Sequence, residues 1–269
     1  MEPNAAQSFF SRLWDDYSRI TPQANAIKQL LHECGERFRN DHVAIRTFGM
    51  PGIDIEHLES FFTELGYVGT GEYQFETKKL FAKSYSHPSN ELPRVFISEL
   101  IMNKCSTKLN ACVRTLIERL PLPLDAQSLL TQQALWPTVE YDVYQTLLKE
   151  SEYAAWVAAF GIRANHFTVN ADDLQGFKDL TELNNFLVEH GFALNHPESP
   201  VHGSPEELLE QSSTRADEIL WSFENGEKRR IRSCYYEFCK RYTDPKSGKL
   251  YDGFIPESAD KIFESTNVR

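Results

Sequence analysis

Two histidines stand at equivalent places in two similar stretches of the chain, and a glutamate lies near the end of the second stretch. His42 and His166 each begin a short, mostly apolar run, and an amphipathic helical pattern follows each run and ends at Gly66 or Gly191. Glu237 lies on an apolar stretch that closes the second unit. Imidazole nitrogens and carboxylate oxygens are common ligands of iron and zinc. The pattern therefore predicts an internal duplication with metal ligands at matching positions.

Two imidazoles and one carboxylate make up the triad that holds iron(II) and leaves coordination positions open for a substrate and dioxygen. Zinc accepts the same three ligands. His42, His166 and Glu237 lie far apart in the chain, so only the symmetry of the repeat predicts that they share one site. The alternative is that each histidine is an ordinary structural residue of a strand.

Arg46 has a residue type and a position suited to binding a substrate. Side chains two apart on a strand share a face, so His42, Ala44 and Arg46 point the same way. The small Ala44 leaves room between the two functional groups. A guanidinium there would hold the far carboxylate of a small diacid by a bidentate, charge-assisted pair. The alternative for Arg46 is an ordinary salt bridge.

Two further side chains are open to several interpretations. Glu99 in the first unit resembles Glu237 in the second, and is a candidate fourth ligand, an acceptor for a histidine N–H or a salt-bridge partner. We favour the noncatalytic roles for Glu99. Five cysteines without a CxxC pair indicate reduced, mostly buried thiols. Cys239 alternates onto the face of Glu237 and is an alternative thiolate ligand.

The remaining histidines of interest lack the spacing of metal ligands. His57 lies on the polar side of the first amphipathic helix, and the other three lie at a helix end and in loops: His190, His196 and His202. We expect all four at the surface. The basic run at 228–232 follows a hairpin turn and is expected to be a solvated strand start instead of a nucleic-acid site.

Composition excludes several classes of protein. The chain has 269 residues, of which 41% are hydrophobic and 25% charged, as in a globular protein. Its formal net charge of −11 disfavours nucleic acid and anionic membranes as partners. No run reaches the roughly 18 apolar residues that a membrane-spanning helix needs, and the first residues lack the features of a secretory signal. We therefore expect a cytoplasmic protein.

The pattern of elements predicts a mixed α+β chain built around the two units. Between the units we expect helices only, including one long helix through 144–156. In the second unit we expect a short helix that begins at Ser204, and a hairpin whose returning strand runs from 228 to 242. We expect one catalytic domain, made of a helical lead-in (1–40), a first module (41–102), a helical insert (103–160), a second module (161–242) and a C-terminal segment (243–269).

Four short motifs, taken in order, resemble the 2-oxoadipate dioxygenase/decarboxylase family, whose members are also called hydroxyglutarate synthases. The motifs are DHVAIRTF at 41–48, NHFT at 165–168, YYEF at 235–238, and PESA at 256–259 followed by IFES at 262–265. The family belongs to the vicinal oxygen chelate superfamily. The resemblance therefore implies paired βαβββ modules that form a curved sheet around a metal, with the C-terminal segment lining the site.

The resemblance also implies roles for individual residues. His42, His166 and Glu237 would bind iron(II), Arg46 would hold the distal carboxylate of the substrate, and Ser258 would lie near the substrate. The implied reaction uses dioxygen to decarboxylate and hydroxylate a small 2-oxo diacid, with 2-oxoadipate giving 2-hydroxyglutarate and carbon dioxide.

Two alternatives remain. One is a glyoxalase-type isomerase or lyase, in which zinc or nickel polarises a carbonyl and a carboxylate such as Glu99 moves a proton. The other is a noncatalytic module that binds a small molecule.

Overall fold

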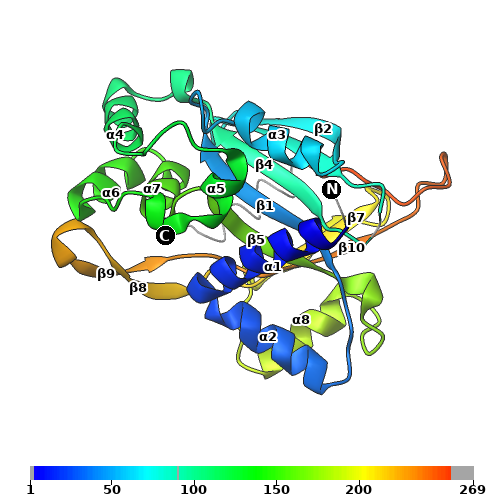
Figure 1. Ribbon diagram of the computed structural model, residues 1–269. Coiled ribbons are helices and arrows are strands. Elements are labelled where there is room, and N and C mark those ends of the chain that lie inside the picture. Colours follow the sequence, from blue (N-terminus) through cyan, green and yellow to red (C-terminus); the bar gives the residue numbers. More distant parts are fainter. Residues whose placement is uncertain (1–2, 90, 256–269) are drawn as a thin grey trace.

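The computed structural model describes residues 3–89 and 91–255, which form one large sheet flanked by helices (Figure 1). The strands of the large sheet are β1 (Asn40–Phe48), β2 (Val68–Phe75), β3 (Leu80–Ser86), β4 (Arg94–Leu100), β5 (Arg163–Asn170), β6 (His202–Ser204), β7 (Leu209–Ser213) and β10 (Glu237–Arg241). A separate hairpin consists of β8 (Glu218–Ser222) and β9 (Lys228–Arg232). The α-helices are α1 (Pro3–Ile20), α2 (Pro22–Glu33), α3 (Ile55–Glu64), α4 (Thr107–Ile117), α5 (Ala126–Thr131), α6 (Tyr141–Leu148), α7 (Glu152–Phe160) and α8 (Leu180–Glu189).

The strand order shows that the sheet consists of two copies of one module. The strands lie in the order β2-β3-β4-β1-β5-β10-β7-β6. In each half the central strand, β1 or β5, pairs in parallel with the last strand of its module, and two antiparallel strands follow outward. The expected paired βαβββ modules are therefore confirmed. α3 and α8 are their helices, and the β8–β9 hairpin is an insertion in the second module.

The pairing of the two central strands defines which residues are equivalent. β1 and β5 run antiparallel, and Val43 faces Phe167. An approximate two-fold axis through this pair relates His42 to His166. The two histidines are therefore neighbours because of the fold's own symmetry, although the helical insert separates them in the chain.

Each central strand also carries a β-bulge beside its histidine. The register of β1 against β5 shifts by one residue at Asp41 and again at Asn165. The same two-fold axis relates these two positions. A bulge interrupts the alternation of side chains, so a bulged residue is not forced onto the face opposite its neighbour.

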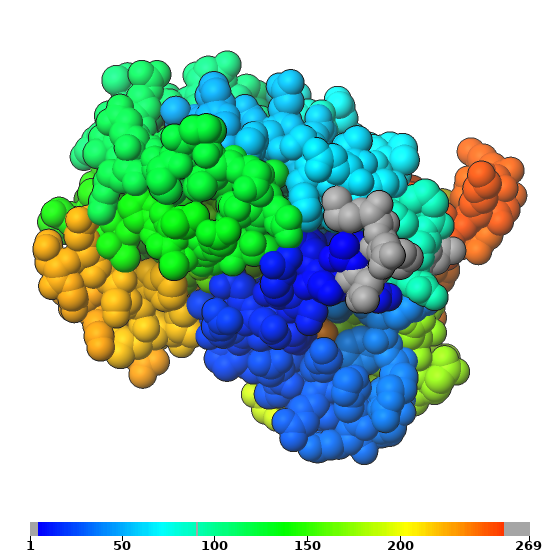
Figure 2. All heavy atoms as spheres, in the orientation of Figure 1, coloured from blue at the N-terminus to red at the C-terminus, as the bar shows by residue number. Residues whose placement is uncertain are grey.

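Helix α1 and two helices of the insert, α5 and α7, contact the central strands, and the blue and green segments lie side by side on the surface (Figures 1 and 2). Trp14 and Tyr17 of α1 pack their rings against Phe167 of β5. In α7, every residue from 153 to 160 is buried. Apolar burial stabilises a fold by roughly 25 cal/mol per Å². The main core therefore lies between the sheet and these helices.

The helical insert differs from expectation in one respect. The single long helix expected through 144–156 is two helices, α6 and α7. The side chain of Ser151 accepts a hydrogen bond from the N–H of Ala154 (3.1 Å) and so caps a new helix. The long-helix prediction was wrong for this reason. No helix in the described ranges is long and apolar enough to cross a membrane.

The short helix expected at Ser204 is a β-turn region between β6 and β7. The Ser204 hydroxyl does accept a hydrogen bond from the N–H of Glu207 (3.2 Å), as a helix cap would. Leu208, however, adopts a φ of 67°, which reverses the chain and starts the antiparallel β7. The local capping signal was real, but the helix prediction was wrong.

The strand expected from 228 to 242 is divided in two. β9 pairs only with β8, whereas β10 pairs with β5 and β7 in the main sheet. Between them the backbone bonds to other segments: Ser233 donates to the carbonyl of Asp217 (2.8 Å), and Tyr236 donates to the hydroxyl of Thr214 (3.0 Å). Strand alternation therefore cannot be extended from β9 to Glu237, and that part of the prediction was wrong.

Candidate metal centre

Three side chains, one from each of three adjacent strands of the sheet, meet at one buried point. In the register of the sheet, Thr168 of β5 faces His42 of β1 on one side and Glu237 of β10 on the other. The Nε2 atom of His42 lies 3.4 Å from one carboxylate oxygen of Glu237, and Nε2 of His166 lies 3.3 Å from the other. All three side chains are buried. The structure thus brings together the three residues that sequence symmetry singled out.

Each histidine is oriented by the residue that precedes it. Nδ1 of His42 lies 2.8 Å from the carboxylate of Asp41, and Nδ1 of His166 lies 3.3 Å from the amide oxygen of Asn165. The bulges at 41 and 165 make these contacts between sequence neighbours possible. A hydrogen on each Nδ1 leaves a lone pair on each Nε2. Nε2 of His166 faces Glu237, and Nε2 of His42 lies between the Thr168 hydroxyl (3.0 Å) and Glu237 (3.4 Å). Sequence analysis missed both acceptors because strict alternation would place them on the opposite face.

Glu237 is held through only one of its oxygens. Gln211 of β7 donates its amide N–H to Oε1 (2.7 Å). Oε2 accepts no hydrogen bond from any residue in the described part of the chain. A carboxylate oxygen that is fully buried and facing an imidazole lone pair is unfavourable unless a cation lies between them. Nothing in the sequence near Gln211 pointed to this contact.

The protonation states suit a cation as well. Burial lowers the pKa of His166 to about 3 despite the opposing charge of Glu237, so this imidazole is neutral. Burial favours the acid form of Glu237, but the neighbouring histidines hold its pKa below the ordinary value. Burial also opposes the charged form of His42, yet Glu237 and Asp41 raise its pKa. A divalent ion would replace the proton that these two carboxylates attract to His42.

The distances fit a metal ion. Ligand atoms bonded at about 2.1 Å to one ion, at angles between right and tetrahedral, lie about 3.0–3.4 Å apart. The separations of 3.4 and 3.3 Å between the imidazole nitrogens and the Glu237 oxygens fall in this range. With oriented imidazoles and an unsatisfied carboxylate oxygen, the residues therefore fit a bound metal.

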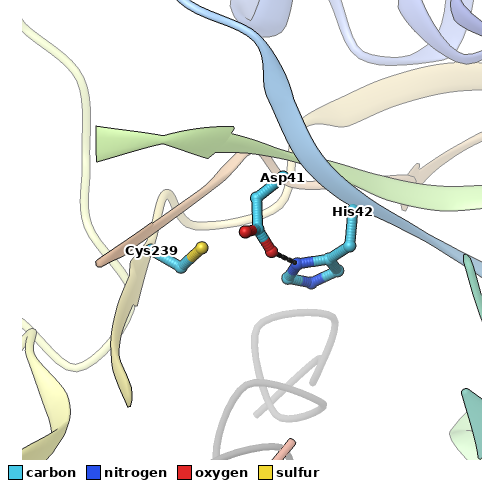
Figure 3. A group of neighbouring side chains, drawn as sticks. All are labelled: Asp41, His42 and Cys239. Carbon is cyan, nitrogen blue, oxygen red and sulfur yellow. Dashed lines mark hydrogen bonds and ion pairs between the residues drawn. The ribbon is translucent and has the colours of Figure 1, made fainter. Parts of the chain in front are cut away.

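A second group of ligand types shares His42 but is a weaker candidate. It consists of Asp41, His42 and Cys239 (Figure 3). Both Asp41 oxygens already accept hydrogen bonds from the guanidinium of Arg241. Burial raises the pKa of the Cys239 thiol well above its usual value, so the thiolate needed for metal binding is disfavoured. Cys239 is therefore a weaker ligand candidate than Glu237.

The centre is asymmetric because one module lacks a ligand. In the second module Glu237 pairs with Thr168, and in the first module Phe96 pairs with Ala44, the residue equivalent to Thr168. Phe96 is therefore the structural counterpart of Glu237. The expectation that Glu99 is this counterpart was wrong. We call the apolar place occupied by Phe96 the open side of the centre.

Glu99 has a different environment. It pairs in register with Thr47, toward the end of β1 remote from His42. Its carboxylate accepts a hydrogen bond from the N–H of Ile55 (2.8 Å), the first residue of α3. Burial raises the pKa of Glu99. This contact satisfies a free N–H at a helix N-terminus, in agreement with the noncatalytic role expected for Glu99.

Arg46 lies on the same strand as His42 and is buried. Its guanidinium carbon lies 5.1 Å from the ring centre of Tyr153 and 5.0 Å from that of Trp156, both in α7. Burial is the main cause of the lowered pKa of His166, and the charge of Arg46 lowers this pKa further. Aromatic faces hold a guanidinium while leaving its N–H edge able to bind a carboxylate.

The four other histidines considered from the sequence do not join the ligand group. His190 is exposed, and His196 is partly buried. His57 is also partly buried, and its Nε2 contacts the carbonyl of Leu124 (2.8 Å). His202 is buried, so the surface location expected for it was wrong. None of these four belongs to a ligand group among the residues that the structure covers.

The C-terminal segment reaches the centre through Phe254. The ring centre of Phe254 lies 4.8 Å from that of His42 and 4.9 Å from that of Phe96. Phe254 therefore borders the open side. Ser258, which the family resemblance places near the substrate, lies outside the described residues.

Known proteins resemble this chain over most of its length. The family model for 2-oxoadipate dioxygenase/decarboxylase matches residues 9–122 and 125–244. The chloroplastic/amyloplastic 2-oxoadipate dioxygenase/decarboxylase of Oryza sativa subsp. japonica is 34% identical, covering 98% of this chain and 80% of that protein.

Solved structures show the same relationship. The hydroxyglutarate synthase of Oryza sativa in complex with 2-oxoadipate has a TM-score of 0.90 and 33% identity, covering 100% of this chain and 95% of that one. A Shewanella frigidimarina protein whose name calls it a hydrolase has a TM-score of 0.86 and 43% identity, covering 93% and 98%. A Ralstonia eutropha protein named for the glyoxalase superfamily, at 22% identity and a TM-score of 0.77, shares the fold.

The fold class expected from the resemblance is therefore confirmed, and the match extends over both modules. By family model, sequence identity and structure, this chain belongs to the 2-oxoadipate dioxygenase/decarboxylase family.

Proposed function

We propose that this protein is an iron(II)-dependent dioxygenase that converts 2-oxoadipate and dioxygen to 2-hydroxyglutarate and carbon dioxide. The observation that carries the proposal is the buried centre, where His42, His166 and Glu237 meet and the symmetry-related fourth place is apolar. Three protein ligands leave positions for a chelating substrate and dioxygen. The family of the chain and the 2-oxoadipate complex of the rice relative support this choice of substrate.

Ferrous iron, when bound, supplies the activation of dioxygen and the electron transfers of the reaction. The overall reaction needs no further reductant. Decarboxylation of the 2-oxo acid and hydroxylation of the shortened acid are each two-electron oxidations, and together they consume one dioxygen. One oxygen atom ends in the new carboxylate and the other in the hydroxyl group.

The protein's first contribution is to orient the ligands before the metal binds. Asp41 contacts Nδ1 of His42 and Asn165 contacts Nδ1 of His166, so that each Nε2 points toward the proposed metal position. Gln211 fixes Glu237 through Oε1 and leaves Oε2 for the metal. Such outer hydrogen bonds typically contribute about 10- to 100-fold in metal affinity.

The second contribution is a charge for the distal carboxylate of the substrate. We assign this role to Arg46, because its buried guanidinium lies about 5 Å from two aromatic rings and its strand also carries His42. A planar fork binds a carboxylate through two parallel hydrogen bonds and so fixes which substrate carbon faces the metal. Ser258 is proposed as a further substrate contact from the C-terminal segment.

The third contribution is exclusion of water. Phe96 and Phe254 pack against each other beside His42 and give the open side an apolar wall. A dry site strengthens the interaction between Arg46 and a carboxylate and keeps competing reactants away from the metal.

The whole chain is proposed to act as one catalytic domain, since His42 comes from the first module and the other two ligands come from the second. Its partners are then the 2-oxo acid and dioxygen. The rice relative is named chloroplastic/amyloplastic, and the cytoplasmic location stays a prediction for this chain.

The glyoxalase-type alternative loses its proposed base. Glu99 binds the N-terminus of α3 and is not part of the ligand group. A noncatalytic binding module would not require two oriented imidazoles and an unsatisfied carboxylate oxygen directed at one point. The dioxygenase therefore accounts for the observed groups best.

The test is anaerobic loading of the protein with iron(II), followed by addition of 2-oxoadipate and air-saturated buffer. We expect dioxygen uptake, carbon dioxide release and 2-hydroxyglutarate formation in a 1:1:1 ratio. His42→Ala should lose stoichiometric metal binding and turnover together. Metal binding without dioxygen uptake across a panel of 2-oxo acids would overturn the dioxygenase assignment, and full activity of His42→Ala would overturn the site.

A further inference from the structure

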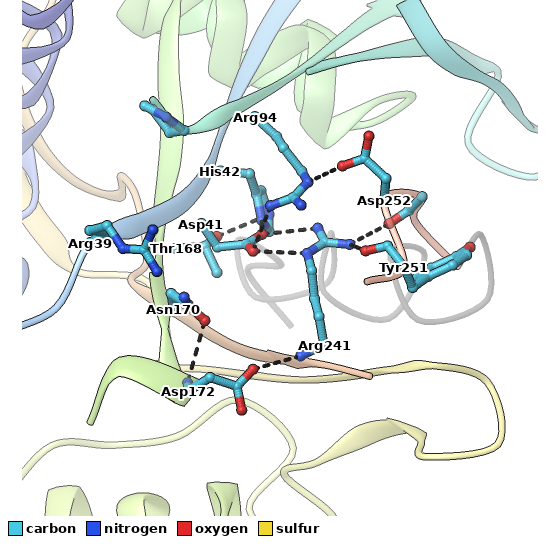
Figure 4. Close-up of polar contacts among 12 residues, drawn as sticks. Arg39, Asp41, His42, Arg94, Thr168, Asn170, Asp172, Arg241, Tyr251 and Asp252 are labelled. Atoms are coloured by element: carbon cyan, nitrogen blue, oxygen red, sulfur yellow. Dashed lines mark hydrogen bonds and ion pairs between the residues drawn. The ribbon is translucent and has the colours of Figure 1, made fainter. Parts of the chain in front are cut away.

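A buried carboxylate next to the centre collects four hydrogen bonds. Oδ1 of Asp41 contacts Nδ1 of His42 (2.8 Å) and Nη2 of Arg241 (2.9 Å). Oδ2 accepts from Nε of Arg241 (2.8 Å) and Nη1 of Arg94 (3.1 Å). Asp41 is therefore ionised and fixed in orientation, and it presents one lone pair to the ring of His42 (Figure 4).

Arg241 uses its guanidinium in two directions. Nε and Nη2 donate hydrogen bonds to the carboxylate of Asp41, while Nη1 donates to the backbone carbonyls of Tyr251 (3.2 Å) and Gly253 (2.7 Å). Arg241 is buried, so both sets of bonds are shielded from water. A single side chain thus connects the acceptor of His42 to a segment that follows β10 (Figure 4).

That segment, residues 251–254, borders the open side of the centre. Asp252 pairs with Nε of Arg94, the second cation on Asp41. Phe254 donates its N–H to the hydroxyl of Tyr73 (3.2 Å) and places its ring against His42. The guanidinium of Arg241 also lies 5.1 Å from the Phe254 ring centre. The segment is therefore held by the same cations that hold Asp41.

We propose that Asp41 and Arg241 form a positioning pair: Asp41 orients His42 toward the metal, and Arg241 fixes Asp41 while holding residues 251–254 over the open side. Neither residue touches the proposed substrate. The inference rests on the proposed metal centre and adds a coupling between metal binding and the placement of the C-terminal segment.

The chemistry of the two residues predicts which substitutions separate the two roles. Asp41→Asn keeps the shape but removes the charge that strengthens the Nδ1 hydrogen bond of His42. Arg241→Lys keeps the charge but cannot bind a carboxylate through a fork and two carbonyls at the same time. Arg94→Gln removes the cation that pairs with Asp252 but leaves the fork of Arg241 on Asp41 intact.

The experiment combines anaerobic calorimetric titration with cobalt(II) and hydrogen exchange of the peptide that covers 250–255. We expect Asp41→Asn to weaken cobalt binding 10- to 100-fold with unchanged exchange at 250–255. We expect Arg241→Lys to weaken binding similarly and to speed exchange at 250–255 at least tenfold. Arg94→Gln should speed exchange while binding weakens less than threefold.

A matched control uses another bidentate arginine–aspartate pair that does not contact a ligand histidine. Arg39, which directly precedes β1, forms such a pair with Asp173, and the side chain of Arg39 is half exposed. Asp173→Asn should change neither cobalt affinity nor exchange at 250–255. Circular dichroism checks that each variant is folded.

Each outcome decides a separate statement. Wild-type protein that binds no cobalt(II) overturns the proposed metal centre, while the exchange measurement still tests the hold of Arg241 on the segment. Normal cobalt affinity in folded Asp41→Asn overturns the positioning of His42. Unchanged exchange in folded Arg241→Lys overturns the coupling to the segment, and if Arg241→Lys does not fold, Asp41→Asn and Arg94→Gln still test the two halves.

Discussion

Phe96 and Glu237 occupy equivalent positions in the two modules, one apolar and the other a proposed metal ligand. Each pairs with the residue two positions beyond the module's histidine, Ala44 in the first case and Thr168 in the second. A fully symmetric pair of modules would supply two histidines and two carboxylates. Because the first module has a phenyl ring at this position, the two modules together supply three ligands. Three protein ligands leave coordination positions for a substrate and dioxygen.

Phe96→Glu should convert the open centre into one with four protein ligands. We expect metal affinity to rise about tenfold and dioxygen uptake with 2-oxoadipate to fall more than 100-fold, because the added carboxylate takes a position that the reaction uses. The two quantities are measured by anaerobic titration with cobalt(II) and by an oxygen electrode.

Phe96→Leu is the matched control, since it keeps the open side apolar and should retain most of the turnover. Its stability should fall by about 1 kcal/mol through loss of ring packing against Phe254. Full dioxygen uptake by Phe96→Glu with metal bound would contradict the account of the open side.

Sequence symmetry was sufficient to predict that His42 and His166 are neighbours, because both lie in the first half of the central strand of a module. The same counting failed for Glu99, since the β8–β9 hairpin lengthens the second module before its last strand. Only the hydrogen-bond register of the sheet shows that Phe96 is the counterpart of Glu237. Insertions inside a repeat therefore limit how far such alignment can reach.

The outer contacts of the centre were not predictable from alternation. Asp41 and Asn165 directly precede the histidines, and a regular strand would turn them away. The bulges that turn them back depend on how β1 and β5 pair, which is a tertiary property. The sequence did contain one indication of these contacts. A residue with a side-chain oxygen acceptor, Asp41 or Asn165, directly precedes each of the two symmetry-related histidines.

Arg46→Lys should weaken the binding of a dicarboxylate substrate without removing the metal. Loss of the bidentate fork is expected to cost about 1.5–3 kcal/mol, or roughly 10- to 100-fold in KM for 2-oxoadipate, with a smaller effect on kcat. Steady-state kinetics measure both parameters. Cobalt(II) affinity should be unchanged.

A substrate control makes this prediction specific. 2-Oxohexanoate lacks the distal carboxylate, so wild type and Arg46→Lys should use it with similar kcat/KM. An equal loss for both substrates would show that Arg46 acts on something other than the distal carboxylate.

Glu99→Gln should leave turnover within twofold of wild type. In the structure the Glu99 carboxylate accepts a hydrogen bond from the N–H of Ile55, and the carbonyl oxygen of a glutamine can still accept this bond. Glu99→Ala removes this acceptor and should lower the free energy of unfolding by about 1 kcal/mol, again with little effect on kcat. Loss of activity in folded, metal-loaded Glu99→Gln would restore Glu99 as a catalytic base and favour the isomerase alternative.

Asp217 should make the stability of the protein depend on pH. Burial raises the pKa of Asp217 to about 6, despite a hydrogen bond from the N–H of Gln23 (3.1 Å) that favours the ionised form. Between the unfolded value of about 3.9 and the folded value, the folded state binds more protons, so stability falls as pH rises through this window and stays lower above it. Asp217→Asn keeps an acceptor for Gln23 and removes the buried charge.

We expect Asp217→Asn to raise the free energy of unfolding at pH 8 by about 1 kcal/mol, a figure reduced from the full shift because the side chain is partly exposed. At pH 5 the gain should be about half as large, because unfolded Asp217 is already ionised there while folded Asp217 is mostly protonated. Thermal unfolding of the apo protein, followed by circular dichroism at both pH values, measures the difference. Asp142→Asn, at an exposed position in α6, should give the same small change at both pH values. A gain for Asp217→Asn at pH 5 equal to that at pH 8 would show that the charge of Asp217 does not oppose folding.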